Sequence, residues 1–137
     1  MPYSKHRIYI LAILLFSATI FSCNYKNNSR QIARIDYRLS GCFADYKSKL
    51  IIYEKEGNTF AKLLTDKNSN MFSQVRLNPQ KVEKLNLFIK ELKNLKGDIG
   101  CTTVEYYTVY INDEKIIKVD GGCDWRGYSK LESLIFN

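Results

Sequence analysis

The stretch from Cys101 to Cys123 constrains the fold most, because it has the pattern of a β-hairpin with a cysteine at the foot of each arm. β-Branched and aromatic residues fill the first arm, Val104–Ile111, and a second such run follows at Lys115–Asp120. Turn-forming residues separate the runs, and we expect the turn to be centred on Asp113 and Glu114. The arms of an antiparallel pair end at the same edge, so this pattern predicts that the two cysteines lie close together.

Side-chain alternation divides this hairpin into two faces. The expected register pairs Ile111 with Ile116 and Tyr110 with Ile117. We expect the core face to carry Tyr106, Thr108, Tyr110, Ile117 and Val119. The other face carries Tyr107, Val109, Ile111, Ile116, Lys118 and Asp120. Tyr107 is thereby a candidate for contact with a partner.

The cysteines predict a disulfide bond between Cys101 and Cys123. Closing the loop between them would stabilise the fold by about 3 kcal/mol. The alternative is a pair of reduced, buried cysteines. Cys42 is expected to be a free thiol, with pairing to either of the other two as the alternative. A disulfide bond also requires export, because such bonds persist in oxidising compartments.

The N-terminus has the layout of a secretory signal peptide. Lys5, His6 and Arg7 precede an apolar run that extends from Ile8 to Phe21. As a helix this run would reach about 21 Å, which is short of the roughly 30 Å hydrocarbon core of a bilayer. Export followed by removal of the segment is therefore expected, rather than a transmembrane anchor.

The end of this run, Ile20-Phe21-Ser22-Cys23, resembles the lipobox of bacterial lipoproteins, although Phe21 stands where that family usually has a small residue. In that family the cysteine is lipidated and the peptide before it is removed. The resemblance implies a signal peptide over residues 1–22 and lipid attachment at Cys23, which amounts to stable membrane anchoring. By similarity to enteric lipoproteins, Asn24 after the cysteine favours the outer membrane. The alternative is an ordinary cysteine near a signal peptide that is cut elsewhere.

The mature chain is expected to be one domain. Residues 23–30 are polar and form a tether, and residues 31–137 are long enough for a single core. Removing residues 1–22 takes away Lys5 and Arg7 and no acidic residue, which lowers the formal net charge from +7 to +5. The lysines are scattered along the chain, so we expect no nucleic-acid partner.

The composition excludes several catalytic chemistries. His6 is the only histidine and would leave with the signal peptide, so the mature chain has no basis for Ser-His-Asp or Cys-His catalysis or for a His-ligated metal. Glu105, Asp120 and Asp124 are the only acids clustered near an expected surface turn, and a carboxylate pair could hydrolyse a glycosidic bond. Any domain of this size carries such acids. We therefore expect no enzymatic activity, no cofactor and no metal.

The remaining elements complete an α+β fold. A first strand is expected at Gln31–Leu39, and a second hairpin at Lys49–Glu56 and Thr59–Thr65 around a Gly57-Asn58 turn. The clearest helix has Asn78 as its cap, Pro79 at its first position and Gly97 beyond its end. Its apolar stripe consists of Val82, Leu85, Phe88, Ile89, Leu92 and Leu95.

A short last helix is predicted from the capping-box spacing of Ser129 and Glu132. The expected order is β-β-β-α-β-β-α. It gives an antiparallel sheet of about five short strands with one long amphipathic helix packed on a face.

The loop Asp120–Tyr128 is the strongest candidate for partner binding. It contains Asp124, Trp125 and Arg126, and Trp and Arg dominate interaction hot spots. The alternative is structural: Trp125 packs over the disulfide bond and Arg126 pairs with Asp124.

Two functions fit these features. The first is a membrane-anchored binding or structural module that meets an envelope protein or glycan. The second is a periplasmic inhibitor or immunity-type protein that blocks one enzyme. Small lysozyme-inhibiting lipoproteins have a similar profile, but their targets are basic and would repel a domain of charge +5. A long acidic protrusion would favour inhibition, and a broad aromatic patch would favour general binding.

Overall fold

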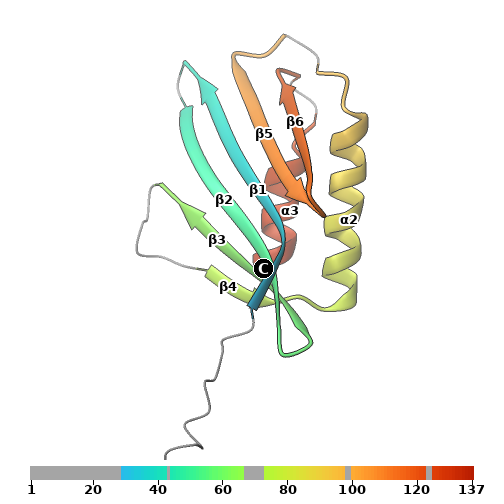
Figure 1. Cartoon of the computed structure of the whole chain (residues 1–137). Helices are drawn as coiled ribbons and strands as arrows, with labels where there is room; N and C mark the ends of the chain where they lie inside the picture. Colours follow the sequence, from blue (N-terminus) through green and yellow to red (C-terminus); the bar gives the residue numbers. More distant parts are fainter. Residues whose placement is uncertain (1–28, 43, 67–72, 98–99, 123–124) are drawn as a thin grey trace, which may run out of the picture.

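The computed structural model describes residues 29–42, 44–66, 73–97, 100–122 and 125–137. These residues form one antiparallel sheet with the strand order β4-β3-β2-β1-β5-β6, and two helices (Figure 1). The elements, in chain order, are β1 Ser29–Gly41, β2 Ala44–Lys55, β3 Asn58–Thr65, β4 Ser73–Arg76, α2 Pro79–Asn94, β5 Thr103–Ile111, β6 Glu114–Asp120 and α3 Gly127–Phe136. The predicted α+β class and antiparallel sheet are confirmed. The predicted signal peptide, Cys23, Cys123 and Asp124 lie outside the described residues.

The prediction of five strands is wrong, because the sheet has six. The missed strand, β4, has only four residues and pairs with β3 through contacts such as Val75 with Ala61. Its sequence, SQVR, contains a single apolar side chain, so it has no alternating hydrophobic pattern to detect. The bond from the Leu77 N–H to the Thr59 carbonyl, 2.8 Å, extends the pairing beyond the strand. As a short edge strand, β4 also offers little unpaired backbone to another chain.

The two hairpin turns each lie one residue earlier than predicted. The β2–β3 loop is Glu56–Gly57, and the β5–β6 loop is Asn112–Asp113. All four residues have positive φ angles, between 47° and 72°. Two-residue loops of this conformation match the twist of the flanking strands, and Gly, Asn and Asp adopt it at low cost. The expected register is therefore wrong by two positions: Ile111 lies opposite Glu114, and Val109 lies opposite Ile116.

The predicted core face of this hairpin is also wrong. The buried face carries Tyr107, Val109 and Ile116, whereas Ile117 is 62% exposed. The reason is the central strand β1, whose Ile35 and Tyr37 lie opposite Val109 and Tyr107 and continue the apolar row.

Two polar residues, Lys118 and Asp120, interrupt the apolar pattern of the buried face, and each makes a hydrogen bond there. The amine of Lys118 reaches the Leu95 carbonyl at 3.2 Å, and the Asp120 carboxylate accepts the Gly122 N–H at 2.9 Å. Neither residue therefore keeps this face out of the core.

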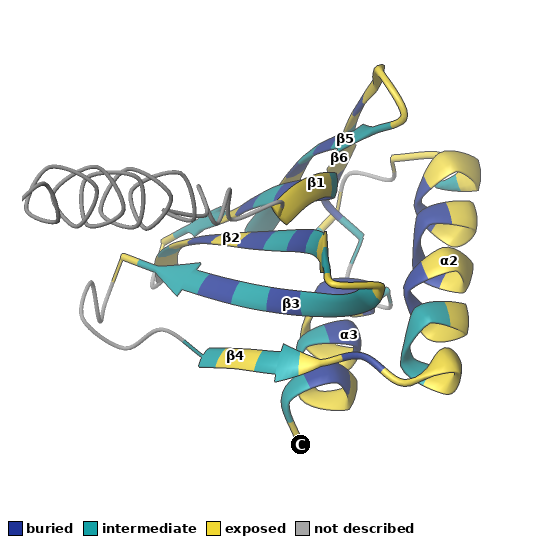
Figure 2. Ribbon diagram, turned by 60° about the horizontal axis from the view of Figure 1, so that its bottom comes forward, coloured by how far each residue is buried: buried dark blue, intermediate teal, exposed yellow. Residues whose placement is uncertain are grey.

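The long helix follows its sequence signals closely. Asn78 accepts the Lys81 N–H at 2.8 Å, and Pro79 is the first helical residue. The predicted stripe is confirmed, with Leu85, Phe88, Ile89 and Leu92 buried. Figure 2 shows this buried side of α2 turned toward the sheet and its exposed side turned to solvent. The predicted stop at Gly97 is wrong: the helix ends at Asn94 with Leu95 as an extended C-cap, and Gly97, with φ +73°, lies two residues beyond the cap.

The last helix, α3, begins earlier than predicted. Arg126 is its N-cap residue and makes no side-chain capping bond, so the predicted Ser129–Glu132 capping box is wrong. The Ser129 hydroxyl instead donates to the Arg126 carbonyl at 3.1 Å, inside the first turn. Tyr128, Leu131 and Ile135 are buried, so α3 adds a second helix to the layer that covers the sheet. Neither described helix is both long and apolar enough to span a membrane.

Candidate functional site

Trp125, the strongest sequence candidate, lies where α3 meets α2. Its ring stacks on Phe88 with a centroid distance of 5.7 Å and lies edge-on to Tyr107 at 5.6 Å. The indole is only partly buried, so one of its faces supports the core and the rest is accessible. Arg126 is exposed at the start of the helix. The alternative contacts, with the disulfide bond and with Asp124, involve residues outside the described part of the chain.

Gly127 permits this position of the indole. A Cβ atom on Gly127 would lie 2.2 Å from the nearest carbon of the Trp125 ring, far inside van der Waals contact. The helix backbone therefore lies directly against the ring. Glycine at this position is a packing requirement.

Gly127→Ala is expected to displace the indole and to lower the free energy of unfolding by about 1–3 kcal/mol, the range for overpacked sites. Trp125 is the only tryptophan, so its fluorescence reports the movement without interference. We expect the emission maximum to shift to longer wavelength. Gly100→Ala is the matched control, because a Cβ there meets nothing within 4 Å. Identical spectra and stabilities for the two variants would contradict the packing.

A groove of about 800 Å³ runs between α2 and α3 beside the indole. Phe88, Leu95, Trp125 and Leu131 supply buried or half-buried apolar surface. Its lining residues are Lys84, Leu87, Phe88, Glu91, Asn94, Leu95, Lys96, Trp125, Gly127, Lys130, Leu131 and Leu134. The helices run antiparallel, because the Lys81 amine near the start of α2 donates to the Ile135 carbonyl near the end of α3 at 2.7 Å.

Two exposed leucines distinguish this groove from ordinary protein surface. Leu87 on α2 is 42% exposed and Leu134 on α3 is 40% exposed. Both line the groove, one from each helix, and both are among the few large apolar side chains exposed in the described residues. Grouped exposed apolar side chains mark interaction sites more often than single ones do.

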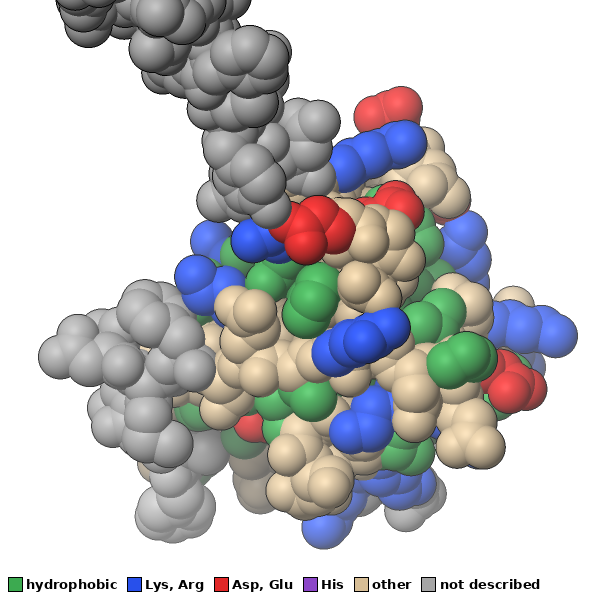
Figure 3. All heavy atoms as spheres, turned by 90° about the horizontal axis from the view of Figure 1, so that it is seen from below, with side chains coloured by type: hydrophobic (Ala, Val, Ile, Leu, Met, Phe, Trp, Pro, Cys, Tyr) green, Lys and Arg blue, Asp and Glu red, His purple; other side chains and the backbone are tan. Residues whose placement is uncertain are grey.

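The groove rim is predominantly basic. Lys84, Lys96 and Lys130 line it against a single acid, Glu91. These lysines belong to none of the ion pairs between described residues. On the end of the molecule drawn in Figure 3, by contrast, Lys and Arg side chains alternate with hydrophobic and other side chains. The groove thus combines an apolar floor with a concentration of positive charge.

Tyr107 does not reach the surface that the sequence assigned to it. It is 1% exposed and belongs to an aromatic cluster with Tyr37, Phe88, Trp125 and Tyr128. Its hydroxyl donates to the Glu105 carboxylate, which also accepts the Tyr37 hydroxyl at 3.0 Å. Tyr107 therefore supports the indole from below and cannot itself contact a partner.

Burial perturbs the ionisation of these tyrosines. Desolvation raises the pKa of Tyr37, Tyr107 and Tyr128 well above the usual value, and the Glu105 carboxylate raises the pKa of the first two further. Desolvation also raises the pKa of the half-buried Glu132 carboxyl on α3. The phenols stay protonated in the folded chain at pH values where an unfolded chain loses their protons.

Alkaline pH is therefore expected to destabilise the fold. As the pH rises through about 10, the unfolded state binds fewer protons than the native state, so each of Tyr37, Tyr107 and Tyr128 lowers the free energy of unfolding by about 1.4 kcal/mol between pH 9 and pH 11. Together they predict a fall of about 4 kcal/mol over this range, most of it above pH 10, measured by urea unfolding. Tyr128→Phe should reduce this fall by about one third. A stability that does not change over this range would contradict the expectation.

Of the three carboxylates considered for catalysis, Glu105 and Asp120 lie away from the groove, and Asp124 lies outside the described residues. Glu105 and Asp120 face each other across β5 and β6. Glu105 binds two tyrosine hydroxyls, and Asp120 is 3% exposed, with one carboxylate oxygen on the Gly122 N–H and the other without a hydrogen-bond partner among the described residues. Neither acid lines the groove. The described residues also contain no group of three or more metal-ligating side chains.

The position of Cys101 agrees with the predicted hairpin. The Cys101 N–H donates to the Gly121 carbonyl at 2.8 Å, which places the foot of one arm beside the foot of the other. Cys42 is free and exposed. Because Cys123 lies outside the described residues, its pairing with Cys101 stays a prediction. The backbone bond joins Cys101 to a residue two positions before the predicted partner in the sequence.

Comparisons with known proteins add no relative: no family, curated protein or solved structure matches this chain.

Leu87, Leu134 and the rim lysines were missed by sequence reasoning. One signal was available, because Leu87 is an apolar residue outside the predicted stripe of its helix. Leu134 carries no such signal, since an apolar residue in a short last helix is ordinarily assigned to the core. The groove itself depends on how α3 packs beside α2, which no local pattern specifies.

Proposed function

We propose that this chain is a lipid-anchored module of the bacterial cell envelope that binds a partner protein in the α2–α3 groove. Cys23 is the attachment point of the anchor, with the outer membrane favoured. The observation that carries the binding proposal is the pair of exposed leucines, Leu87 and Leu134, facing one groove whose floor includes Trp125. The chemistry is recognition rather than catalysis.

The groove selects the kind of partner. Its volume, about 800 Å³, and its course between two antiparallel helices suit one amphipathic segment, helical or extended, with apolar anchors on one side. The rim of Lys84, Lys96 and Lys130 against Glu91 favours acidic residues flanking those anchors. We therefore assign the groove to an acidic, amphipathic segment of an envelope protein.

The alternative function, an inhibitor or immunity-type protein, is less well supported. Inhibition of this kind favours a protruding acidic loop that enters an enzyme. The two described hairpin loops, Glu56–Gly57 and Asn112–Asp113, each contain only two residues. A recessed groove with an aromatic wall instead supports a receiving surface. Envelope glycans and nucleic acids are not the partners that this groove favours, because it combines leucine side chains with a short basic rim.

Site-specific photocrosslinking in intact cells tests the groove. A photoreactive amino acid at position 87 is expected to give a discrete adduct with one other protein. Position 86 is exposed on α2 but does not line the groove. The same group there should give at least about tenfold less adduct, because position 87 would be buried in the interface and position 86 would lie outside it. Both positions carry the same probe, so the comparison isolates the location.

Substitutions on the opposite wall complete the test. Leu134→Glu should abolish the adduct formed from position 87, whereas Ser133→Glu, at the adjacent exposed position outside the groove, should preserve it. Combined Lys84→Glu, Lys96→Glu and Lys130→Glu should also abolish it if the partner is acidic. Equal labelling from positions 86 and 87, a lipid adduct or an adduct with a second copy of this chain would overturn the proposal. An adduct with an enzyme that this chain inhibits would favour the alternative.

A further inference from the structure

The face of the sheet opposite the helices carries a cluster of positively charged side chains. Neither described helix covers this open face, which is turned toward the viewer in Figure 1. Strand alternation and the observed register place on it the cations Arg34, Arg38, Lys47, Lys49, Lys55, Lys62, Arg76 and Lys115, against the acids Asp36, Asp45 and Asp66. Eight cations against three acids give this face a formal charge of +5.

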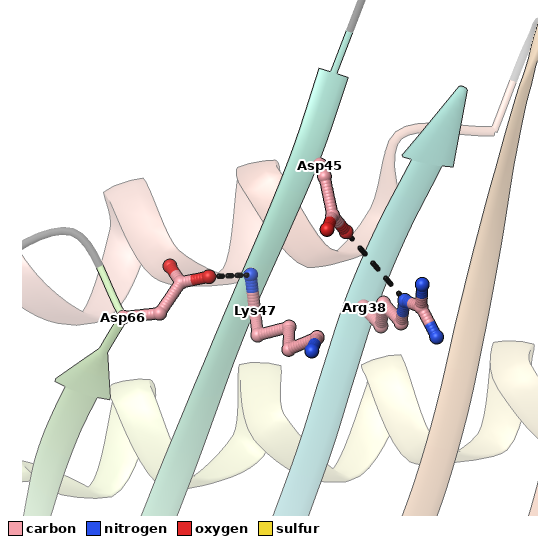
Figure 4. A network of polar contacts seen from close by, with 4 residues as sticks. All are labelled: Arg38, Asp45, Lys47 and Asp66. Atoms are coloured by element: carbon pink, nitrogen blue, oxygen red, sulfur yellow. Dashed lines mark hydrogen bonds and ion pairs between the residues drawn. The ribbon is translucent and has the colours of Figure 1, made fainter. Parts of the chain in front are cut away.

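Like charges lie side by side in the middle of this face. Arg38 of β1 is directly opposite Lys47 of β2, an arrangement that is unfavourable unless an anion compensates it. Figure 4 shows how little compensation the protein provides. Asp45 contacts Arg38 at 3.5 Å with both side chains more than half exposed, and the Asp66 carboxylate accepts the backbone N–H of Lys47, not its amine. The Lys47 ammonium is in none of the ion pairs between described residues.

Exposed apolar side chains adjoin these cations on strands β5 and β6. Tyr106 and Val119 lie opposite each other and are each 43% exposed. Ile117, two residues before Val119 on the same face of β6, is 62% exposed. Arg38 is the neighbour of Tyr106 on the other side. The patch therefore presents three apolar groups beside the strongest concentration of positive charge on the sheet.

We infer that the open face is a docking surface for an anionic membrane leaflet. Cations near a bilayer are attracted to anionic headgroups, and apolar side chains beside them gain by entering the interface. The biological setting rests on the proposed anchor at Cys23. Only five residues lie between that cysteine and Ser29, the start of β1, so a fully extended tether of six residue steps reaches about 20 Å. The domain would spend its time close to the leaflet, with the open face inward and the α2–α3 groove outward toward its partner.

Vesicle binding tests this inference without using the anchor. The core residues extend from Ala33 to Ile135, so the chain from residue 23 onward with Cys23→Ala contains the whole fold. We expect it to sediment with vesicles of equal phosphatidylcholine and phosphatidylglycerol at least about tenfold more strongly than with pure phosphatidylcholine, and to lose this preference in high salt.

Two variants of equal charge change locate the binding surface. Lys47→Glu, Lys49→Glu and Lys115→Glu together should reduce sedimentation at least about tenfold. Lys84→Glu, Lys96→Glu and Lys130→Glu make the same change of charge at the helix groove and should leave it within about twofold. Equal losses in the two variants would mean that net charge alone acts, and would overturn the inference.

A polarity-sensitive dye supplies the second readout. When the dye is attached at position 117 in a Cys42→Ser background, its emission maximum should shift to shorter wavelength on anionic vesicles. The same dye at position 134 should show no shift. The membrane assignment would be overturned if the dye at position 117 showed no shift on anionic vesicles. It would also be overturned if a soluble anionic polysaccharide bound the protein and abolished vesicle binding, while the dye on vesicles showed no shift. Neither result bears on the crosslinking from position 87 or on the lipid at Cys23, so failure of this inference is distinguishable from failure of the proposed function.

Discussion

Tyr107→Ala is expected to lower the free energy of unfolding by about 3–5 kcal/mol, the range for removing a large aromatic side chain from a core. Tyr107 is 1% exposed and its ring contacts Phe88 and Trp125. Its removal also takes one of two hydroxyl donors from the Glu105 carboxylate. A partly buried carboxylate left with fewer hydrogen bonds adds to the cost of the cavity. The loss should be visible as a lower urea midpoint at pH 7.

Tyr106→Ala is the matched control, since it makes the same chemical change one residue earlier. Tyr106 is 43% exposed on the open face, so its removal should cost less than about 1 kcal/mol. The comparison therefore tests which face of the β5–β6 hairpin is buried. Larger destabilisation by Tyr106→Ala than by Tyr107→Ala would restore the face assignment that the sequence alone suggested.

Cys101→Ala is expected to lower the free energy of unfolding of the oxidised protein by about 3 kcal/mol, the value for loss of a disulfide bond that closes a loop of this size. The bond from the Cys101 N–H to the Gly121 carbonyl holds the two arms together at the point where the predicted partner, Cys123, follows. Treatment of the wild type with a reducing agent should produce a similar loss. The same treatment should leave Cys101→Ala unchanged.

Cys42→Ala serves as the control for this second experiment. Cys42 is free and exposed, so its replacement should change stability by less than about 0.5 kcal/mol, as is usual at surface positions. The variant should also remain sensitive to reduction. If reduction has no effect on the wild type, or if Cys42→Ala removes the sensitivity, the Cys101–Cys123 pairing is wrong.

The long helix and the order of the elements other than β4 could be predicted because local chemistry determines them. Asn78, Pro79 and the stripe through Leu85 and Leu92 specify α2 without reference to the rest of the chain. The antiparallel class of the sheet follows from the two hairpins that the sequence predicts, β2–β3 and β5–β6. What failed was non-local: β4 has one apolar residue and forms because β3 offers it an edge.

The inverted hairpin face shows the same limit more sharply. Both faces of β5 and β6 carry aromatic and β-branched residues, and the face with fewer polar residues, which includes Ile117, is the exposed one. The choice is made by β1, which aligns Tyr37 with Tyr107 and so continues one apolar row under the helices. A pattern within one hairpin contains no information about that third strand.

The candidate site could be predicted in part. Trp125 was identified from residue type alone, and the structure places it in the lining of the groove between α2 and α3. Its neighbours in that groove come from a helix about 40 residues earlier in the chain, such as Leu87, so they become a site only when the helices pack. Tyr107 was selected on the wrong face and instead supports the indole from the core.

The central claim is that this chain is matured at Cys23 and held in the envelope by lipid, and the most direct measurement is the intact mass of the protein extracted from membranes. We predict a chain that begins at Cys23, carries acyl groups on that residue and contains one disulfide bond. A soluble chain that begins at Met1, with no lipid and with all four cysteines reactive as free thiols, would contradict it.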